Sequence, residues 1–435
     1  MSNLDLSKLQ NLVRTGAAAR SRVTLQPAGG EGTKVFPPTY AGAVYAIEKR
    51  RLPDYKEPVD CVLLDSVQSQ ANRMEEALQQ AIDNGRISIP VVEVDFTEFF
   101  PGTNKPESLR LLEAVGKVTS LQAPHRIVDA ILRDSVVVDE DNKPFRAKDV
   151  EKESSYGQRL RRVTAQNATA LFELCPTALL FGMWDSTGPK GGLGAKFERA
   201  MVSEIVGINA RRGCKTSSRI DPLGIQLQAG PLYQTPEGGW TLEAEKAKKE
   251  RSQPVKLGKD GRPSEANHGN VTPSLSEKDR DGEFLAGGVT IDRAEQTIVL
   301  SFPALRRLNF PTEKIPEGKT QEDVNVAART VLAALGLCAA ALAAEAGLDL
   351  RSRCLLWPTE PLKWELLGQP GRIEKDILIT AEDAIQLLNS AIQAATQIGL
   401  PWRTEPLRLR PSDELVKLVV KSQQLAIQQG GEGGE

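Results

Sequence analysis

The stretch VDCVLLDSVQSQANRMEEAL, residues 59–78, places a short apolar segment directly before an amphipathic one. The apolar run of residues 59–64 has the length of a strand buried on both faces. Residues 66–82 are predicted to form a helix with Asp65 or Ser66 as its N-cap, because oxygen-bearing side chains accept hydrogen bonds from the first backbone N–H groups of a helix. A strand followed at once by a helix indicates a fold that contains both kinds of element.

The rest of the chain continues this alternation in its first half and becomes mainly helical in its second half. Apolar periodicity and turn residues define these elements. We expect strands at residues 87–96 (with Pro90 at an edge or bulge) and 177–184, helices at 124–133 and 195–209, a hairpin at 288–302 with its turn around 293–295, and helices at 322–346, 381–398 and 412–429.

Length and composition indicate an ordinary globular protein. The 435 residues allow two or three domains, or one domain with large insertions, and the net charge is only −2. No signal-peptide pattern is recognised at the N-terminus, so we expect a cytoplasmic location. The apolar run of residues 331–348 is rich in alanine and contains Glu345, which favours a packed helix over a membrane span.

The sequence offers little support for a metal or cofactor site. Five cysteines stand far apart and there are only two histidines, so the spacing of a zinc finger or ribbon is missing. We therefore expect no cofactor and no bound metal, with the cysteines buried as small apolar side chains.

The most unusual motif is WDSTGPKGGLGAKFERAMVSEI, residues 184–205, where glycines and lysines lie between the predicted strand and helix. A P-loop requires Gly-Lys-Ser/Thr, but here Lys196 follows an alanine and precedes Phe197. The dinucleotide fingerprint fails too, because Phe197 stands where the third glycine belongs. Two interpretations remain open: backbone amides at a helix N-terminus that hold a phosphate, or a tight turn with solvated lysines.

Positive charge is concentrated around this motif. Residues 190–219 contain seven basic and two acidic residues, and residues 244–262 contain seven basic and three acidic residues. Basic loops are most often merely solvated, but the overlap of the first group with the glycine-rich motif favours RNA binding.

Two further segments carry polar side chains suited to phosphates and sugars. Gln68, Gln70, Asn72 and Arg73 lie together near the end of the first strand. His125 has no recognisable nucleophile or orienting partner for general-base catalysis, so a polar cap or an RNA contact shared with Arg126 is the favoured interpretation.

Four stretches resemble a known family: residues 20–40 (RSRVTLQPAGGEGTKVFPPTY), 59–78, 120–135 (SLQAPHRIVDAILRDS) and 171–207 (LFELCPTALLFGMWDSTGPKGGLGAKFERAMVSEIVG). They are similar to the backbone subunit (seventh Cas family, RAMP superfamily) of the type I-G, formerly I-U, CRISPR Cascade effector complex. The resemblance covers roughly residues 4–225. It implies an α+β fold, a modified RNA-recognition-motif (ferredoxin-like) palm with finger and thumb insertions and a helical C-terminal part.

The resemblance also implies a domain plan. Residues 1–234 would form the palm core with its RNA-binding loops, and the polar, basic segment 235–282 would be a thumb or finger insertion. Residues 283–429 would complete the core with a hairpin and add a helical region, and the tail, residues 430–435, would be disordered.

The implied function is a non-catalytic scaffold in antiviral defence. Several copies would polymerise along one guide RNA as a helical filament, while a thumb presses into the strand so that guide bases are presented to target DNA in segments. The implied partners are the guide RNA, target DNA through the guide, other copies of the chain, the Cascade large subunit, a fused fifth- and sixth-family Cas subunit and a helicase-nuclease that joins later. No membrane is implied.

The residues to which the resemblance assigns RNA contacts are Arg20, Arg22, Gln68, Gln70, Asn72, Arg73, His125, Arg126, Lys190, Gly191, Gly192, Gly194, Lys196, Arg199, Arg211, Arg212, Lys215 and Arg219. The alternative is a metal-dependent, RNA-cleaving nuclease of the same superfamily that uses Asp65 or Asp185. Two lone aspartates are weak support for catalysis.

Overall fold

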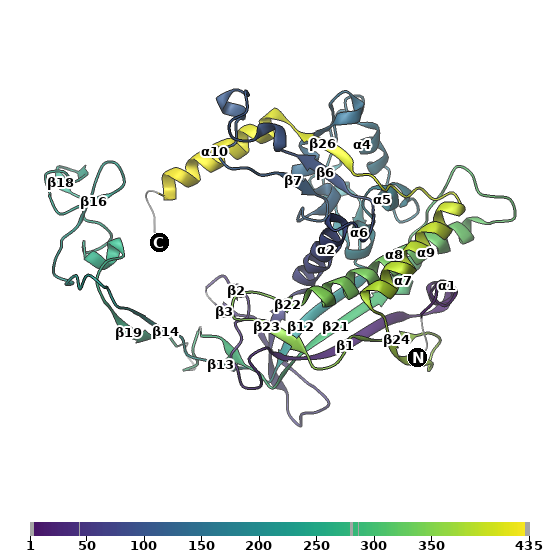
Figure 1. Cartoon of the computed structure of the whole chain (residues 1–435), viewed down its shortest axis with the longest axis horizontal. Coiled ribbons are helices and arrows are strands. Elements are labelled where there is room, and N and C mark those ends of the chain that lie inside the picture. Colours follow the sequence, from purple (N-terminus) through teal and green to yellow (C-terminus); the bar gives the residue numbers. More distant parts are fainter. Residues whose placement is uncertain (1–3, 43, 279–281, 286, 431–435) are drawn as a thin grey trace.

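The computed structural model describes residues 4–42, 44–278, 282–285 and 287–430. Its largest element is an antiparallel sheet in the order β22-β23-β1-β21-β12-β5-β4, with β24 pairing to β1 and β25 to β24 (Figure 1). The strands of this sheet are β1 (Ala18–Pro27), β4 (Ile47–Arg50), β5 (Val59–Asp65), β12 (Met201–Ile208), β21 (Arg293–Ser301), β22 (Leu348–Asp349), β23 (Leu355–Pro358), β24 (Lys363–Leu367) and β25 (Ile373–Leu378).

The connectivity of this sheet confirms an α+β fold. Helix α2 (Val67–Asp83) lies between β1 and β12 in the chain, and helix α8 (Gln321–Ala346) lies between β21 and the β23–β24 region. The spatial order β24-β1-β21-β12 is that of a ferredoxin-like βαββαβ unit. Helices α1 (Leu6–Thr15), α7 (Phe302–Arg306) and α9 (Ala381–Gln397) pack with α8, so the helices form a layer over the sheet (Figure 1).

Helix α8 is the centre of the hydrophobic core. Every residue from Val324 to Leu342 is buried, which explains why the segment is apolar all round. Its length and composition would suffice for a membrane span, yet 94% of its most apolar window is buried inside the protein. The predicted packed helix is therefore confirmed.

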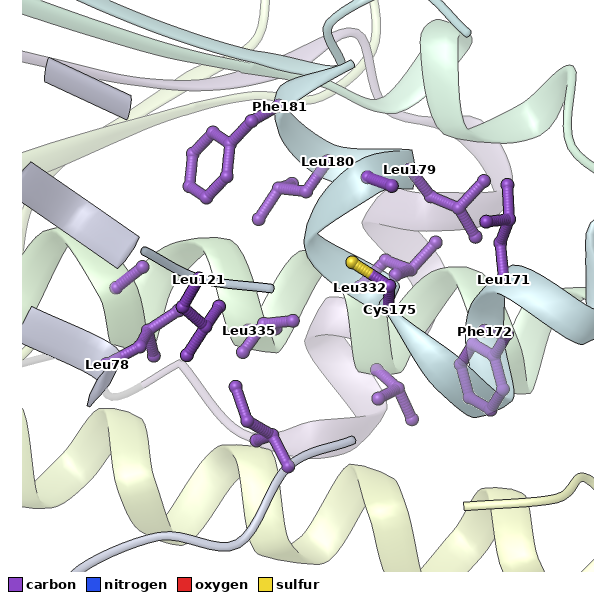
Figure 2. Close-up of a cluster of buried hydrophobic side chains, with 14 of the residues drawn as sticks. Leu78, Leu121, Leu171, Phe172, Cys175, Leu179, Leu180, Phe181, Leu332 and Leu335 are labelled. Carbon is purple, nitrogen blue, oxygen red and sulfur yellow. The ribbon is translucent and has the colours of Figure 1, made fainter. Parts of the chain in front are cut away.

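A smaller lobe is built from residues 84–200 together with the C-terminal segment. Its sheet has the order β7-β6-β26-β8-β9, from β6 (Val92–Asp95), β7 (Lys117–Thr119), β8 (Ser135–Val137), β9 (Lys143–Pro144) and β26 (Leu407–Pro411). The helices of this lobe are α3 (Ala130–Arg133), α4 (Ser155–Leu160), α5 (Thr169–Leu174), α6 (Pro176–Phe181) and α10 (Asp413–Gly430). Figure 2 shows Leu171, Leu179 and Leu180 beside Leu332 and Leu335 of α8, so the lobe shares one core with the palm.

The connection between β12 and β21 leaves the body as a long arm, residues 211–290 (Figure 1). Its stalk is a two-stranded ribbon in which β13 (Arg211–Arg212) pairs with β20 (Val289–Thr290) and β14 (Thr216–Arg219) with β19 (Val271–Leu275). A small distal part contains β15 (Tyr233–Gln234), β16 (Trp240–Thr241), β17 (Lys249–Glu250) and β18 (Gln253–Pro254). The polar segment 235–282 thus lies within a longer excursion.

Asp221 fixes the junction between the stalk and the distal part of the arm. Its carboxylate accepts hydrogen bonds from the backbone N–H groups of Gly269 (2.8 Å) and Leu223 (3.2 Å). Although burial opposes ionisation, these donors hold the pKa of Asp221 below its usual value. The remaining short strands are β2 (Thr39–Tyr40), β3 (Val44–Tyr45), β10 (Met183–Trp184) and β11 (Lys196–Phe197).

Two predicted elements around the glycine-rich motif are wrong. Residues 176–181 form helix α6 and not a strand, because Pro176 starts a short helix and a brief apolar run fits either element. Residues 195–209 form β11 and β12 and not a helix. In β12 buried residues alternate with less buried ones from Met201 to Ile205, which is the period of a strand.

Other elements differ in extent or pairing. Only residues 92–95 of the predicted strand 87–96 pair as a strand, and residues 124–133 split into a 3₁₀ turn, Arg126–Val128, and α3, which Asp129 caps. Residues 288–302 are not a hairpin, since β20 pairs with β13 while β21 pairs with β1 and β12. The helices predicted at 66–82, 322–346, 381–398 and 412–429 are confirmed within two residues, and Ser66 caps the first. Of the predicted tail, residues 431–435 lie outside the described residues.

Candidate nucleic-acid interface

The glycine loop, residues 185–195, closes a hairpin between β10 and β11. Trp184 pairs with Lys196, and the backbone N–H of Asp185 donates to the carbonyl of Ala195 at 2.9 Å. The loop therefore does not lead into a helix, and the expected helix N-terminus with its positive dipole end is absent at this place.

The glycines of this loop allow the backbone to fold tightly around Asp185. A Cβ atom on Gly188 would lie 2.0 Å from a carboxylate oxygen of Asp185, and one on Gly194 would lie 1.8 Å from its carbonyl oxygen. Gly191 has a φ of +56°, in the left-handed region. Gly191 and Gly192 both belong to a single 3₁₀ turn, Gly191–Leu193. The glycines thus serve the closure of the loop.

A buried ion network anchors the loop to the smaller lobe. Arg146 donates to Asp185 at 2.8 Å, and the two side chains are 2% and 8% exposed. Arg146 also lies 3.4 Å from buried Glu153, which in turn pairs with Arg161 at 2.8 Å. A buried charge needs such partners because the loss of hydration is otherwise uncompensated.

The outer surface of the hairpin is basic and partly apolar. Lys190, Lys196 and Arg199 are exposed and form no salt bridge with any residue that the structure describes. Trp184 is 54% exposed, and Leu193 at the loop tip is 88% exposed. The ammonium of Lys196 lies 5.4 Å from the centre of the Trp184 ring. Side chains, rather than backbone amides at a helix end, therefore give this surface its charge.

The structure brings the His125–Arg126 segment onto the base of the same hairpin. Arg126 is buried and donates through two nitrogens to the two carboxylate oxygens of Glu75, each at 2.7 Å, and through a third to the carbonyl of Gly182 at 3.0 Å. Burial raises the pKa of Glu75, while the charge of Arg126 opposes that rise. Arg126 is thus part of a buried ion pair, whereas His125 is exposed.

The polar residues of α2 separate into buried and exposed members. Gln70 and Arg73 donate to buried Asp65 at 2.7 and 3.0 Å, and Arg351 donates to the same carboxylate at 3.1 Å. The Gln70 side-chain oxygen accepts a hydrogen bond from Ser203 at 2.7 Å, so both the nitrogen and the oxygen of this amide have partners inside the protein. Gln68 and Asn72 are exposed, and their spacing of four residues puts them on one helix face.

Arg20 and Arg22 lie on the face of the sheet opposite the helices. Alternate residues of β1 are buried, and these two arginines project from the other side. Arg20 donates to Glu365 at 2.8 Å and Arg22 to Glu295 at 3.4 Å. They line a cavity of about 460 Å³ whose other charged lining residues have both signs. The structure leaves this face of mixed charge separate from the glycine loop.

The basic residues of the arm stalk complete the predicted set. Arg211 and Lys215 are exposed, whereas Arg212 and Arg219 are half-buried. Arg211, Lys215 and Arg219 form no salt bridge within the described ranges. These cations follow β12, whereas those of the glycine hairpin precede it. The eight residues of β12 lie between the two groups in the chain, and a strand of that length spans about 26 Å at ~3.3 Å per residue.

The sequence pattern did not identify several residues that make contacts near the base of the arm. Lys34 donates to the carbonyl of Cys214 at 2.8 Å, and the Arg353 guanidinium lies 4.0 Å from the centre of the Phe36 ring. Arg351 joins the Asp65 cluster from the segment after α8. Nothing in the local pattern of residues 34–36 or 351–353 signals these contacts, which depend on long-range packing. Trp184 was part of the quoted motif, but its exposure appears only in the structure.

The two aspartates considered for catalysis are each held by arginine. Asp65 accepts hydrogen bonds from Gln70, Arg73 and Arg351, and Asp185 accepts one from Arg146. Across the part of the chain that the structure describes, no group of three or more His, Cys, Asp or Glu side chains could hold a metal ion.

These features define an α+β protein in which two groups of cations, Lys190, Lys196 and Arg199 before β12 and Arg211, Lys215 and Arg219 after it, form no salt bridge within the described part of the chain. The family described as CRISPR-associated protein GSU0053 (Cas_GSU0053) matches residues 20–212, somewhat less than half of the chain. This match indicates a CRISPR-associated protein. No curated protein matches the chain. The matched range ends at Arg212, in the first strand of the arm.

Proposed function

We propose that this CRISPR-associated protein is a non-catalytic, guide-RNA-binding backbone subunit of a type I-G Cascade complex. Several copies would line one guide RNA, and base pairing of that guide would recognise target DNA in the cytoplasm. The large subunit, the fused fifth- and sixth-family subunit and the later helicase-nuclease would be its protein partners. The proposal rests on the four stretches that resemble this subunit and on the positions of the two cation groups beside β12.

The observation that carries the proposal is the position of the two cation groups beyond opposite ends of β12. One group, Lys190, Lys196 and Arg199, precedes β12, and the other, Arg211, Lys215 and Arg219, follows it. The strand between them spans about 26 Å by its rise, which is too long for the phosphates of one mononucleotide and suits a strand of several nucleotides. Phosphate contacts by such side chains supply affinity without selecting sequence.

The arm supports the proposal because it extends a basic, two-stranded ribbon away from the palm (Figure 1). Its stalk carries exposed apolar side chains as well: Ile220 is 87% exposed, and Val271 and Leu275 are also exposed. We assign this ribbon the thumb role, in which it presses against the bound strand and spaces the guide into segments.

The absence of catalysis is part of the proposal. Asp65 and Asp185 are both buried, and their carboxylate oxygens form ion pairs with arginines that stabilise the fold. A metal-dependent nuclease would require carboxylates that face substrate and share a cation.

The test measures binding to single-stranded RNA by fluorescence anisotropy as a function of salt. For single strands the slope of log K against log[salt] is about −0.7 for each phosphate neutralised. Changing Lys190, Lys196 and Arg199 to Gln should flatten the slope by about 2, and so should changing Arg211, Lys215 and Arg219. A matched control changes Lys49, Lys105 and Lys417, which are already salt-bridged to carboxylates.

Purification from cells that express a matching CRISPR array provides the second readout. We expect guide-length RNA to co-purify and to remain intact with magnesium and complementary RNA or DNA. A salt-insensitive or strongly sequence-selective interaction, or cleavage lost on changing Asp65 or Asp185 to Ala, would contradict the proposal.

A further inference from the structure

Trp184 is an exposed tryptophan on a rigidly held hairpin. Its neighbours along the strands, Met183 and Phe197, are buried, and the Asp185–Arg146 pair fixes the residue that follows it. The indole is nevertheless 54% exposed, although burying a side chain of this size usually stabilises a fold. The hairpin therefore holds an aromatic ring at the surface in a fixed position.

The charges around this ring are positive. The Lys196 ammonium lies 5.4 Å from the ring centre. Lys190 and Arg199 are exposed on the same hairpin and without salt bridges in the described residues, and the one exposed carboxylate there, Glu198, is paired with Arg307 at 2.7 Å. A negatively charged partner is therefore favoured over a neutral or positively charged one.

We infer that Trp184 is a stacking platform for one unpaired nucleobase of the bound RNA, with Lys196 contacting the phosphate of the same or the adjacent nucleotide. Every base offers an aromatic face, so stacking adds affinity without selecting sequence. A ring with a cation beside it fits a ligand that has both an aromatic face and a negative charge. This inference rests on the proposed function, because it assigns a subsite to the RNA proposed there.

The experiment compares Trp184→Ala, Trp184→Tyr and Lys196→Gln in the full-length protein, using short end-labelled single-stranded RNA over a range of salt. Loss of one base–aromatic stack should weaken binding by about 5- to 150-fold. Trp184→Ala should cause this loss equally at all salt concentrations, and Trp184→Tyr should retain most of the affinity. Lys196→Gln should instead flatten the salt slope by about 0.7.

Trp357→Ala is the matched control, since Trp357 is 63% exposed and no cation lies over its ring among the described residues. Far-UV circular dichroism of each variant verifies the fold. If Trp184→Ala binds RNA as tightly as Trp357→Ala does, the stacking platform is refuted while the proposed function stands. If the wild-type protein binds no single-stranded RNA, the proposed function itself fails.

A protein-docking role for the same surface gives a different result. Then Trp184→Ala and Leu193→Ala would both reduce self-association, measured by sedimentation, and leave RNA affinity unchanged. That outcome would also overturn the inference.

Discussion

Replacing Asp185 by alanine should destabilise the protein and release the glycine loop. Arg146 is 2% exposed, and its 2.8 Å hydrogen bond to Asp185 is the best contact that its charge makes. Removing one partner of a buried ion pair costs about 3–5 kcal/mol, because the other charge stays buried without compensation. Glu153 remains 3.4 Å from Arg146, so we expect the lower end of that range, about 3 kcal/mol.

Two measurements test this magnitude. Urea denaturation gives the free energy of the first unfolding transition, and hydrogen exchange reports on the loop through the amides of Asp185 and Gly194, which bond to Ala195 and Gly191. Both amides should exchange faster in the variant. Asp134→Ala is the control, since its salt bridge to Arg133 is at the surface and should be worth at most about 1 kcal/mol.

A paired replacement tests whether Asp185 stabilises the protein through its ion pair with Arg146. Arg146→Met combined with Asp185→Leu should recover most of the lost stability, since an apolar pair of similar volume can replace a buried ion pair. An Asp185→Ala variant whose stability and loop exchange match those of Asp134→Ala would refute the reasoning.

The remaining predictions concern a second buried pair, one loop glycine and one helix cap. Glu75→Gln should cost about 3–5 kcal/mol in urea denaturation, because Arg126 is buried and loses the carboxylate that pairs with it; an effect below 1 kcal/mol would contradict this. Gly194→Ala should weaken RNA binding and speed loop exchange, since its Cβ would lie 1.8 Å from a backbone oxygen, whereas at the control Gly368→Ala the nearest atom is 3.9 Å away. Hydrogen bonds from Thr320, aided by Arg14, lower the pKa of Asp323 from 3.8 to about 2, so its stabilisation should be complete above pH 3.8 and disappear as the pH falls through about 2. Acid titration of wild type and Asp323→Asn should therefore converge at low pH, and a constant difference would count against the assignment.

The sequence predicted those elements whose local signals agree with their surroundings. The strand and helix of residues 59–83 were placed within two residues, because an apolar run, a serine cap and a helical period follow one another there. Around residues 176–208 the local signals are ambiguous: TALLF is buried on every side, so its periodicity cannot distinguish a helix from a strand. Tertiary pairing of β12 with β21 and β5 decides that region.

At the candidate site too, the sequence predicts some features, while others depend on tertiary contacts. A count of charges in the sequence treats Arg126 and Lys190 alike, but one is buried against Glu75 and the other is exposed without a salt bridge in the described part of the chain. Pairing depends on residues distant in sequence, such as Glu75 for Arg126 and Glu365 for Arg20. The local pattern therefore shows where basic residues are concentrated, but it could not separate exposed cations from structural arginines.

The glycine-rich motif illustrates why that distinction matters for mechanism. With no helix after the loop, its amides gain no helix dipole, and Gly188 and Gly194 are required because the backbone passes so close to Asp185. The same tight closure holds β10 and β11 together at Trp184 and Lys196 and keeps both side chains at the surface. Under the proposed function, the glycines would thus act on RNA only by closing the hairpin, while the charge and the aromatic face come from the side chains beside them. Substitutions of the glycines should therefore lower affinity by disordering the hairpin, whereas substitutions of Lys190, Lys196 and Arg199 should change the number of phosphates neutralised.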